Sequence, residues 1–224
     1  MTAIASLRVA LCSLLSLGVV APAAGCEVPR TVREAGAREI RAYARAQGKE
    51  VLTFVGYSGA GYEDPAALLE AAGRVLDAHD PATTLVNIGA TAAGIGAVYA
   101  LARERGFATM GIVSTLARDE QVPLAPCVET VFYVRDTTWG GRLPGSTRLS
   151  PTSAAIVAAS RELVGLGGGD VARDELLEAR RRGRRVSFVA FDMDHRLAIA
   201  KAQARGVPVD DFKGSAHAAF AASR

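Results

Sequence analysis

Short apolar runs alternate along the chain with longer segments whose apolar residues recur at helical spacing. The runs are of strand length and largely apolar throughout, which is typical of strands buried on both faces of a parallel sheet. They predict strands over residues 51–55, 84–88, 109–114, 130–134, 163–166 and 186–191. The intervening segments predict helices over residues 66–78, 93–105, 152–161, 171–182 and 196–205.

Strands and helices in alternation indicate an α/β fold in which helices cover both faces of one sheet. We therefore expect a single three-layer domain over residues 50–224, with about six mostly parallel strands. Residues 26–49 are polar and alanine-rich and are predicted as a leading helical segment. The stretch that contains Pro123 and Pro126, and the glycine-bearing residues 135–150, are predicted as irregular loops.

Three glycine-bearing corners, at residues 56–61, 89–96 and 167–170, each close a predicted strand and open a helix. Such corners of a parallel sheet meet at one edge, where open α/β sheets bind ligands. Exposed backbone N–H groups and the positive helix terminus suit that edge to phosphate or another anion. Glycine is also required there for close approach of helix and strand, so each corner alone has a structural explanation. Three corners together favour a ligand site.

The second corner is the best candidate for an anion. Asp64 follows the first corner and Asp170 ends the third, and each carboxylate can cap its own helix and repel a second negative charge. The second corner holds no acid, and its only polar side chain is Thr91. We therefore expect phosphate there, closed over by the first corner. The ligand-binding residues predicted at these two corners are Gly56, Ser58, Gly59, Gly89, Thr91, Gly94 and Gly96.

Further candidates lie at the same predicted edge. Gly168 and Gly169 belong to the third corner, and Glu175 lies just over one turn into the helix that follows. A carboxylate there suits sugar hydroxyls or acid–base work, although an acidic first turn is also ordinary. Arg118 follows the third strand and either neutralises a phosphate or is a solvated arginine. Trp139 either stacks on a ligand or plugs the loop that carries it.

The first 25 residues have the layout of an export signal. Arg8 supplies the positive start, and the apolar run over residues 9–21 is too short for an ordinary membrane span. Residues 23–26 also resemble a bacterial lipobox, in which Cys26 is lipidated and anchors the mature chain to the membrane. Lipidation of Cys26, plain cleavage after Ala23 and an uncleaved apolar anchor remain open. We expect export to the periplasm or cell envelope.

The composition indicates few further kinds of functional site. The formal net charge is +3, too small for a strong nucleic-acid-binding field, so no nucleic-acid partner is predicted. The three histidines are far apart and show no ligand spacing, so we predict no metal site and no cofactor. If Cys26 is lipidated, Cys127 has no partner; if it is not, one disulfide is allowed without being indicated.

At these motifs the chain resembles the Rossmann-like nucleotide-binding superfamily that includes the Lonely Guy phosphoribohydrolases, the lysine-decarboxylase-annotated proteins and SLOG domains. Residues 51–65 resemble its opening strand and serine-bearing turn, residues 87–96 its phosphate-contacting glycine motif, and residues 166–175 its Pro-Gly-Gly-x-Gly-Thr-x-x-Glu signature. The resemblance implies a Rossmann-like fold and places Glu175 at the catalytic glutamate. Val171 and Ala172 stand where the signature has Gly-Thr, and no Arg-Lys pair matches the family's.

Two functions follow as expectations. The first is an exported protein that binds a phosphorylated or nucleotide-derived small molecule, with or without weak phosphoribohydrolase-like hydrolysis through Glu175. The second is a non-enzymatic envelope lipoprotein that uses the fold as a scaffold or interaction module. The sequence predicts no oligomeric state.

Overall fold

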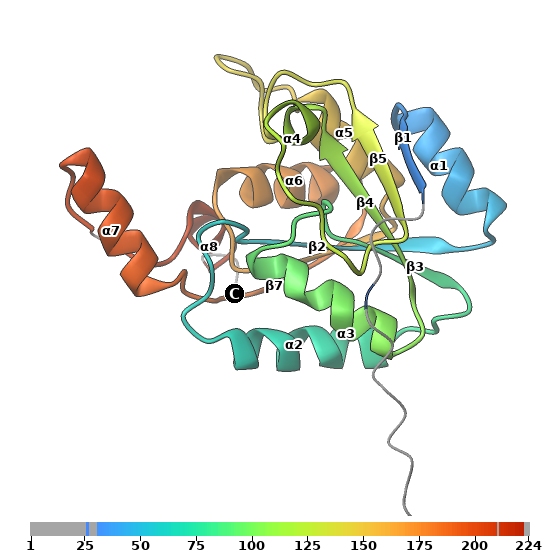
Figure 1. Cartoon of the computed structure of the whole chain (residues 1–224), viewed down its shortest axis with the longest axis horizontal. Coiled ribbons are helices and arrows are strands. Elements are labelled where there is room, and N and C mark those ends of the chain that lie inside the picture. Colours follow the sequence, from blue (N-terminus) through green and yellow to red (C-terminus); the bar gives the residue numbers. More distant parts are fainter. Residues whose placement is uncertain (1–25, 27–30, 210, 222–224) are drawn as a thin grey trace, which may run out of the picture.

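The structure, a computed structural model, describes residue 26, residues 31–209 and residues 211–221. The strands are β1 (Thr31–Glu34), β2 (Glu50–Gly56), β3 (Thr84–Asn87), β4 (Ala108–Ser114), β5 (Thr130–Val134), β6 (Glu162–Leu166) and β7 (Arg185–Val189). They form one sheet in the order β1-β5-β4-β3-β2-β6-β7, and every neighbouring pair is parallel (Figure 1). The predicted α/β fold is confirmed, with seven strands instead of about six.

Helices cover both faces of this sheet, as expected. They are α1 (Ala37–Ala46), α2 (Pro65–Asp77), α3 (Val98–Glu104), α4 (Leu116–Asp119), α5 (Pro151–Ala159), α6 (Asp170–Arg181), α7 (His195–Arg205) and α8 (Ser215–Ala221). The pair α2 and α3 packs on one face, whereas α1, α5, α6 and α8 pack on the other (Figure 1). The helix predicted over residues 93–105 begins instead as a 3₁₀ turn, η1 (Gly94–Ala97).

The leading segment was predicted as wholly helical, and this is wrong for its first part. Residues 31–34 form β1, which pairs with β5 at the edge of the sheet, and α1 follows. All four residues of β1 are exposed, so this strand lacks the apolar run that identified the others. An edge strand needs hydrogen bonds on one side only and tolerates polar side chains.

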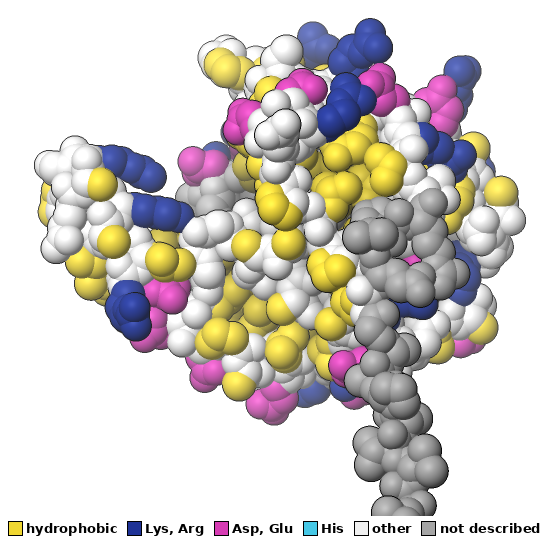
Figure 2. Space-filling view, in the orientation of Figure 1, with side chains coloured by type: hydrophobic (Ala, Val, Ile, Leu, Met, Phe, Trp, Pro, Cys, Tyr) yellow, Lys and Arg dark blue, Asp and Glu magenta, His cyan; other side chains and the backbone are white. Residues whose placement is uncertain are grey.

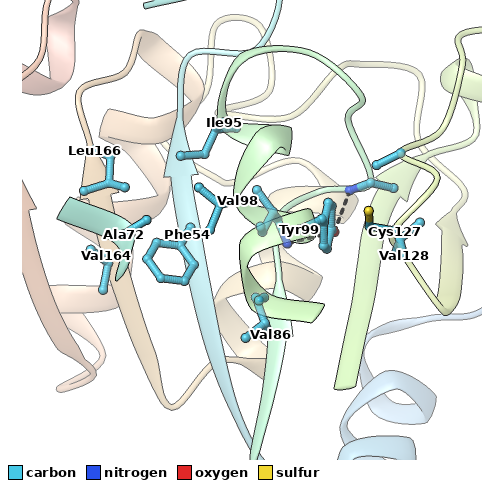
Figure 3. Packing of buried hydrophobic residues seen from close by; sticks show 14 of the residues in the cluster. Phe54, Ala72, Val86, Ile95, Val98, Tyr99, Cys127, Val128, Val164 and Leu166 are labelled. Atoms are coloured by element: carbon cyan, nitrogen blue, oxygen red, sulfur yellow. Dashed lines mark hydrogen bonds between the residues drawn. The ribbon is translucent and has the colours of Figure 1, made fainter. Parts of the chain in front are cut away.

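The core is divided by the sheet into two layers. Along β2, Leu52 and Phe54 belong to the layer under α2 and α3, whereas Val51 and Val55 belong to the opposite layer. This alternation follows from the two-residue period of a strand, and it explains why β2 reads as continuously apolar. Figure 3 shows Phe54 among side chains of the first layer, with Tyr99 beside Cys127.

The strand order places a topological switch point at β2. After β2 the chain builds outward through β3, β4 and β5 on one side, then returns to add β6 and β7 on the other. The helices that follow β2 and β6 consequently lie on opposite faces of the sheet. Their connections diverge beyond the carboxyl ends of the strands, which opens a crevice at this position.

Helix α7 lies apart from the two packed layers (Figure 1). None of its residues is buried, and Figure 2 shows hydrophobic side chains beside Lys and Arg on its surface. Within the described residues, no helix has both the length and the apolar character required to cross a membrane. The export signal predicted over residues 1–25 lies outside the described residues.

Candidate functional site

The three glycine corners are held together at the carboxyl edge of the sheet, as predicted. Ile95 N of the second corner donates a 2.8 Å hydrogen bond to Tyr57 O of the first. Tyr62 links the first corner to the third, because its hydroxyl accepts from Tyr57 N at 2.9 Å and donates to Leu166 O at 2.7 Å. The crevice between the corners is therefore braced by buried hydrogen bonds.

Tyr99, which is fully buried, holds the second corner in place. Its hydroxyl accepts from Ile88 N at 3.0 Å and Ala90 N at 3.1 Å, and it donates to Met110 O at 2.7 Å. Ala90 has φ +58, an uncommon conformation for a residue with a side chain. The Tyr99 hydroxyl thus stabilises a strained turn where β3 ends, and dashed lines in Figure 3 mark the hydrogen bonds that this hydroxyl accepts.

A cavity of about 220 Å³ opens at this edge. It extends from the ends of β2, β3 and β4 to the first turns of α5 and α6. Of the sequence-predicted site residues, six line it, namely Gly56, Ser58, Gly89, Thr91, Trp139 and Glu175. The others, Gly59, Gly94, Gly96, Arg118, Gly168 and Gly169, lie outside its lining.

Several of the glycines outside the lining are required by close backbone packing instead of by contact with a ligand. Gly94 has φ +56, and a Cβ on it would collide with the backbone oxygens of Tyr57 and Ser58. A Cβ on Gly96 would collide with Thr91 O. These glycines allow the first and second corners to approach each other, so they shape the site without lining it.

Glu175 is the only ionisable side chain among the described residues that line the cavity. It is 2% exposed, and its Oε1 accepts a 2.6 Å hydrogen bond from the Ser153 hydroxyl. Burial raises the pKa of Glu175 to about 7; the nearby Asp174 charge adds to the rise, and the Ser153 hydrogen bond opposes it. A carboxyl group with this pKa can both donate and accept a proton near neutral pH.

Ser153 was not predicted as a site residue. It lies in the first turn of α5, and its Oγ also accepts a 2.7 Å hydrogen bond from Gly141 N. The packing of α5 on α6 brings Ser153 and Glu175 together across a separation of 22 residues. No local spacing in the sequence marks such a pair, so a sequence pattern could not have identified it.

Two other buried carboxylates hold the loop that carries Trp139. Asp136 accepts from Thr138 N and Thr152 N, and Asp174 accepts from Arg142 N at 3.0 Å. Burial opposes the ionisation of Asp136, yet these hydrogen bonds lower its pKa. Both acids are occupied by structural hydrogen bonds, which leaves Glu175 as the acid available to the cavity.

Asn87 is a second polar residue of the lining that was not predicted as a site residue. It is completely buried at the end of β3, where Oδ1 accepts from Ile112 N at 3.0 Å and Nδ2 donates to Thr53 Oγ1 at 3.2 Å. These contacts fix the orientation of the amide, and each of its polar atoms retains capacity for one more hydrogen bond. The sequence signal that could have identified Asn87 is a polar residue at the end of an otherwise apolar run.

The hydrogen bonds of the second corner are partly used within the protein. Thr91 Oγ1 accepts from Ala93 N at 3.2 Å, and Gly96 N donates to Ala93 O at 3.1 Å. Ala92 and Ala93 are exposed, and Thr91 is half-buried at the rim of the cavity. The part of this corner that faces solvent is therefore the turn over residues 91–94.

The predicted caps differ between the first and third corners. Asp64 caps α2 as expected, because its Oδ1 accepts from Ala67 N at 2.9 Å. Asp170 does not cap α6; the N-cap is Gly169, and the Asp170 carboxylate pairs with Arg173 at 2.7 Å. The expectation that an acid caps the third helix is wrong, because Asp170 is already the first residue of α6 and its side chain pairs with Arg173 one turn further on.

Trp139 lies at the cavity, whereas Arg118 lies outside its lining. Arg118 forms a 2.7 Å ion pair with Glu34 of β1 and lies over the Tyr133 ring, away from the cavity. Its predicted role as a phosphate ligand is not supported by this position. Trp139 lines the cavity and is 48% exposed, so it is not a buried plug beneath its loop.

Cys26 and Cys127 form a disulfide across a separation of 101 residues. This contact uses the same sulfur that a lipid would occupy, so lipidation of Cys26 and the disulfide exclude each other in one molecule. Cys127 lies close after Val122, Pro123 and Leu124, which line the cavity. The disulfide therefore fastens the chain near one wall of the site.

No family model matches the sequence, and no curated protein matches it. Similar solved structures include the X-ray structure of TM1055, with 20% identity, a TM-score of 0.43, and coverage of 61% of this chain and 72% of that chain. Two structures of the molybdenum cofactor carrier protein from Chlamydomonas reinhardtii also match, both with a TM-score of 0.45. One is 17% identical and covers 62% of this chain and 76% of that chain. The other is 15% identical and covers 78% of this chain and 94% of that chain. These similarities concern the fold and do not identify a ligand or a reaction.

Proposed function

We propose that this protein binds a phosphorylated or nucleotide-derived small molecule in the cavity at the carboxyl edge of its sheet. The observation that carries the proposal is a cavity at the topological switch point with one buried carboxyl group, Glu175, in its lining. Its volume of about 220 Å³ is below the roughly 300–1,000 Å³ of sites that enclose drug-sized ligands. The cavity therefore encloses one ring-sized part of the ligand, and the rest lies on the rim.

The turn over residues 91–94 is the proposed position of a ligand phosphate. It is exposed at Ala92 and Ala93, holds no acid, and leads into the helical segment formed by η1 and α3. Ser58 lies on the same rim and adds a hydroxyl group. Trp139, which also lines the cavity, is partly exposed and has a ring surface that a base or sugar can stack on.

Thermal-shift measurements with nucleoside phosphates, ADP-ribose and sugar phosphates test this proposal, because a ligand that binds only the native state raises Tm. The matched variants are Thr91→Asn and Thr91→Asp. Both side chains accept from the Ala93 amide as threonine does, but only aspartate adds a negative charge at the proposed phosphate position. We expect Thr91→Asn to keep the Tm increase and Thr91→Asp to lose most of it. Equal increases in both variants contradict the phosphate position.

A scaffold function is the competing outcome of the same measurement. It predicts no Tm increase with any of these compounds. A protein that is stable, folded and indifferent to the whole panel is then a structural or interaction module, and the ligand proposal fails.

Weak hydrolysis of an N-glycosidic bond is a second candidate, favoured by the pKa of about 7 at Glu175. In this reaction water replaces the base at the ribose carbon while positive charge develops on the ribose. Glu175 either stabilises that charge as a carboxylate or, when protonated, donates its proton to the departing base. Base release from a nucleotide panel is measured for wild type and Glu175→Gln. Release by wild type that falls at least about 100-fold in the variant supports hydrolysis. If nucleotides bind but no base is released, ligand binding remains the proposed function and hydrolysis is rejected.

Export is a further part of the proposal, with cleavage after Ala23 in preference to lipidation. The disulfide between Cys26 and Cys127 supports it, because disulfides persist in oxidising compartments such as the periplasm. A mature chain that begins shortly before Cys26 keeps that cysteine available for the disulfide. The envelope lipoprotein alternative requires the same sulfur for lipid.

A further inference from the structure

The cavity carries no positive charge of its own. Among the described residues that line it, none is Lys, Arg or His, and the single ionisable group is the acid Glu175. An anion drawn into this space meets a like charge and finds no cationic partner. The interior is thus unsuited to the phosphate that the rim is proposed to hold.

Basic side chains close to the site are already engaged elsewhere. Arg173 pairs with Asp170 at 2.7 Å and with Asp174 at 2.8 Å, and both contacts hold it on the surface of α6. Lys201 of α7 donates a 2.6 Å hydrogen bond to Gly59 O at the first corner. Neither side chain belongs to the cavity lining.

Glu175 itself is incompletely paired. Its one hydrogen bond in the described structure comes from Ser153, and no described cation forms an ion pair with it. The other nearby charge is the carboxylate of Asp174, which has the same sign. A buried carboxylate is stable in the ionised form only with a cationic or strongly donating partner, so a ligand that supplies one binds more tightly than a ligand that does not.

Resting on the proposed function, we propose that the part of the ligand inside the cavity is a flat nitrogen head group, cationic or rich in N–H donors, which pairs with Glu175. Anionic parts of the ligand stay outside on the rim. Apolar side chains also line the cavity, and Ile112 and Ile156 belong to the same core layer as α6, which carries Glu175, so the faces of a planar ring can pack against them. The amide of Asn87 supplies a second polar contact of fixed orientation.

A series of three isosteric probes tests this inference. Benzamidine is a planar cation with N–H donors, benzamide is neutral, and benzoate is an anion; all three are smaller than a purine nucleoside. Dissociation constants are measured at pH 8, where Glu175 is mostly ionised, for wild type, Glu175→Gln and the control Glu178→Gln. Glu178 lies on the same helix but pairs with Arg181 and Arg182 and does not line the cavity.

We expect wild type and Glu178→Gln to bind benzamidine at least about tenfold more tightly than benzoate. Glu175→Gln, which keeps the size of the side chain, should bring the two affinities within about threefold of each other. Benzoate binding as tightly as benzamidine in wild type overturns the inference. So does a Glu175→Gln variant that keeps the wild-type preference.

The same measurements separate this inference from the proposed function. If nucleotides raise Tm but none of the three probes binds, the head-group inference fails and the ligand-binding function stands. If neither nucleotides nor probes bind, the proposed function fails and takes the inference with it. A circular dichroism spectrum and melting curve for each variant confirm that the comparison is between folded proteins.

Discussion

The Ser153 hydroxyl donates a 2.6 Å hydrogen bond to Oε1 of Glu175, the carboxyl group that lines the cavity at the carboxyl edge of the sheet. The same oxygen of Ser153 accepts from Gly141 N at 2.7 Å, so one hydroxyl joins α5, α6 and the Trp139 loop. The protonation of Glu175 is therefore coupled to the backbone that positions the cavity mouth. This arrangement leads to the first two predictions.

The first prediction concerns Glu175→Gln and the pH dependence of stability. The pKa of Glu175 is raised from 4.5 to about 7 in the folded state, so the folded protein holds this proton more tightly than the unfolded chain. The stabilisation of the folded state by this bound proton is fully present below about pH 4.5. It is lost as pH rises to about 7, and the free energy of unfolding falls by about 3 kcal/mol. Glutamine carries no proton to lose. Relative to the variant, wild type should therefore become progressively less stable over this range.

Urea unfolding of both proteins at several pH values between 4 and 8 measures that difference. Other titrating groups are common to the two proteins and cancel in the comparison. Parallel stability curves for wild type and Glu175→Gln contradict the burial and elevated pKa of this carboxyl group.

The second prediction concerns Ser153→Ala, with Ser146→Ala as its control. Both hydroxyls accept from a backbone amide of the same loop, Ser153 from Gly141 and Ser146 from Arg148. The Gly141 contact is buried, so its amide loses its partner, whereas the exposed Arg148 amide can bind water. We expect a loss of about 1–3 kcal/mol for Ser153→Ala and near zero for Ser146→Ala.

Removal of Ser153 also removes the hydrogen bond that lowers the pKa of Glu175. The pKa of Glu175 should rise further in Ser153→Ala, which titration of its side-chain carbonyl carbon by NMR measures. An unchanged pKa, or equal destabilisation by the two alanine variants, refutes the described contact.

Much of the fold was predictable because most strands are buried on both faces. An apolar run such as Thr130–Val134 needs no tertiary information to be assigned, and its predicted bounds match β5. β1 has no such run, since its exposed residues belong to an edge strand that is stabilised only by pairing with β5. Edge pairing of this kind is a tertiary contact, which a local pattern does not encode.

The missing strand explains why Arg118 was considered as a phosphate ligand. Its partner Glu34 belongs to β1, and an assignment that lacks β1 leaves this arginine free to face a ligand. Glu175 was identified because a fixed spacing after the third corner places it in the first turns of α6. Ser153 was missed because its role depends on how α5 packs against α6, which no spacing along the chain reveals.

The third prediction compares Gly94→Ala with Gly48→Ala. Both glycines have positive φ, +56 at Gly94 and +65 at Gly48, so the backbone strain of alanine is similar at about 1 kcal/mol. Only at Gly94 does the new Cβ collide with other atoms, namely the backbone oxygens of Tyr57 and Ser58. Chemical denaturation should show Gly94→Ala at least about 2 kcal/mol less stable than Gly48→Ala. Equal losses argue against the close approach of the first two corners.

The fourth prediction concerns the disulfide. In protein purified from an exporting host, neither Cys26 nor Cys127 should react with a thiol reagent before reduction. The paired replacement of both cysteines by serine should lower stability by about 2–4 kcal/mol, since the disulfide closes a loop of 101 residues. Intact-mass spectrometry checks the alternative directly: lipid on Cys26, with Cys127 left reactive, contradicts the disulfide.

The central claim is that a nucleotide-derived ligand binds in the cavity beside Trp139. Trp139 is the only tryptophan of the chain, so its fluorescence reports on the mouth of this cavity and on no other surface. The measurement is a titration of tryptophan emission with each nucleotide that raises Tm, corrected for absorption by the ligand. We predict a saturable change in emission whose midpoint agrees with the affinity from calorimetry. Saturable binding by calorimetry with no change in Trp139 emission would place the ligand elsewhere and contradict the account.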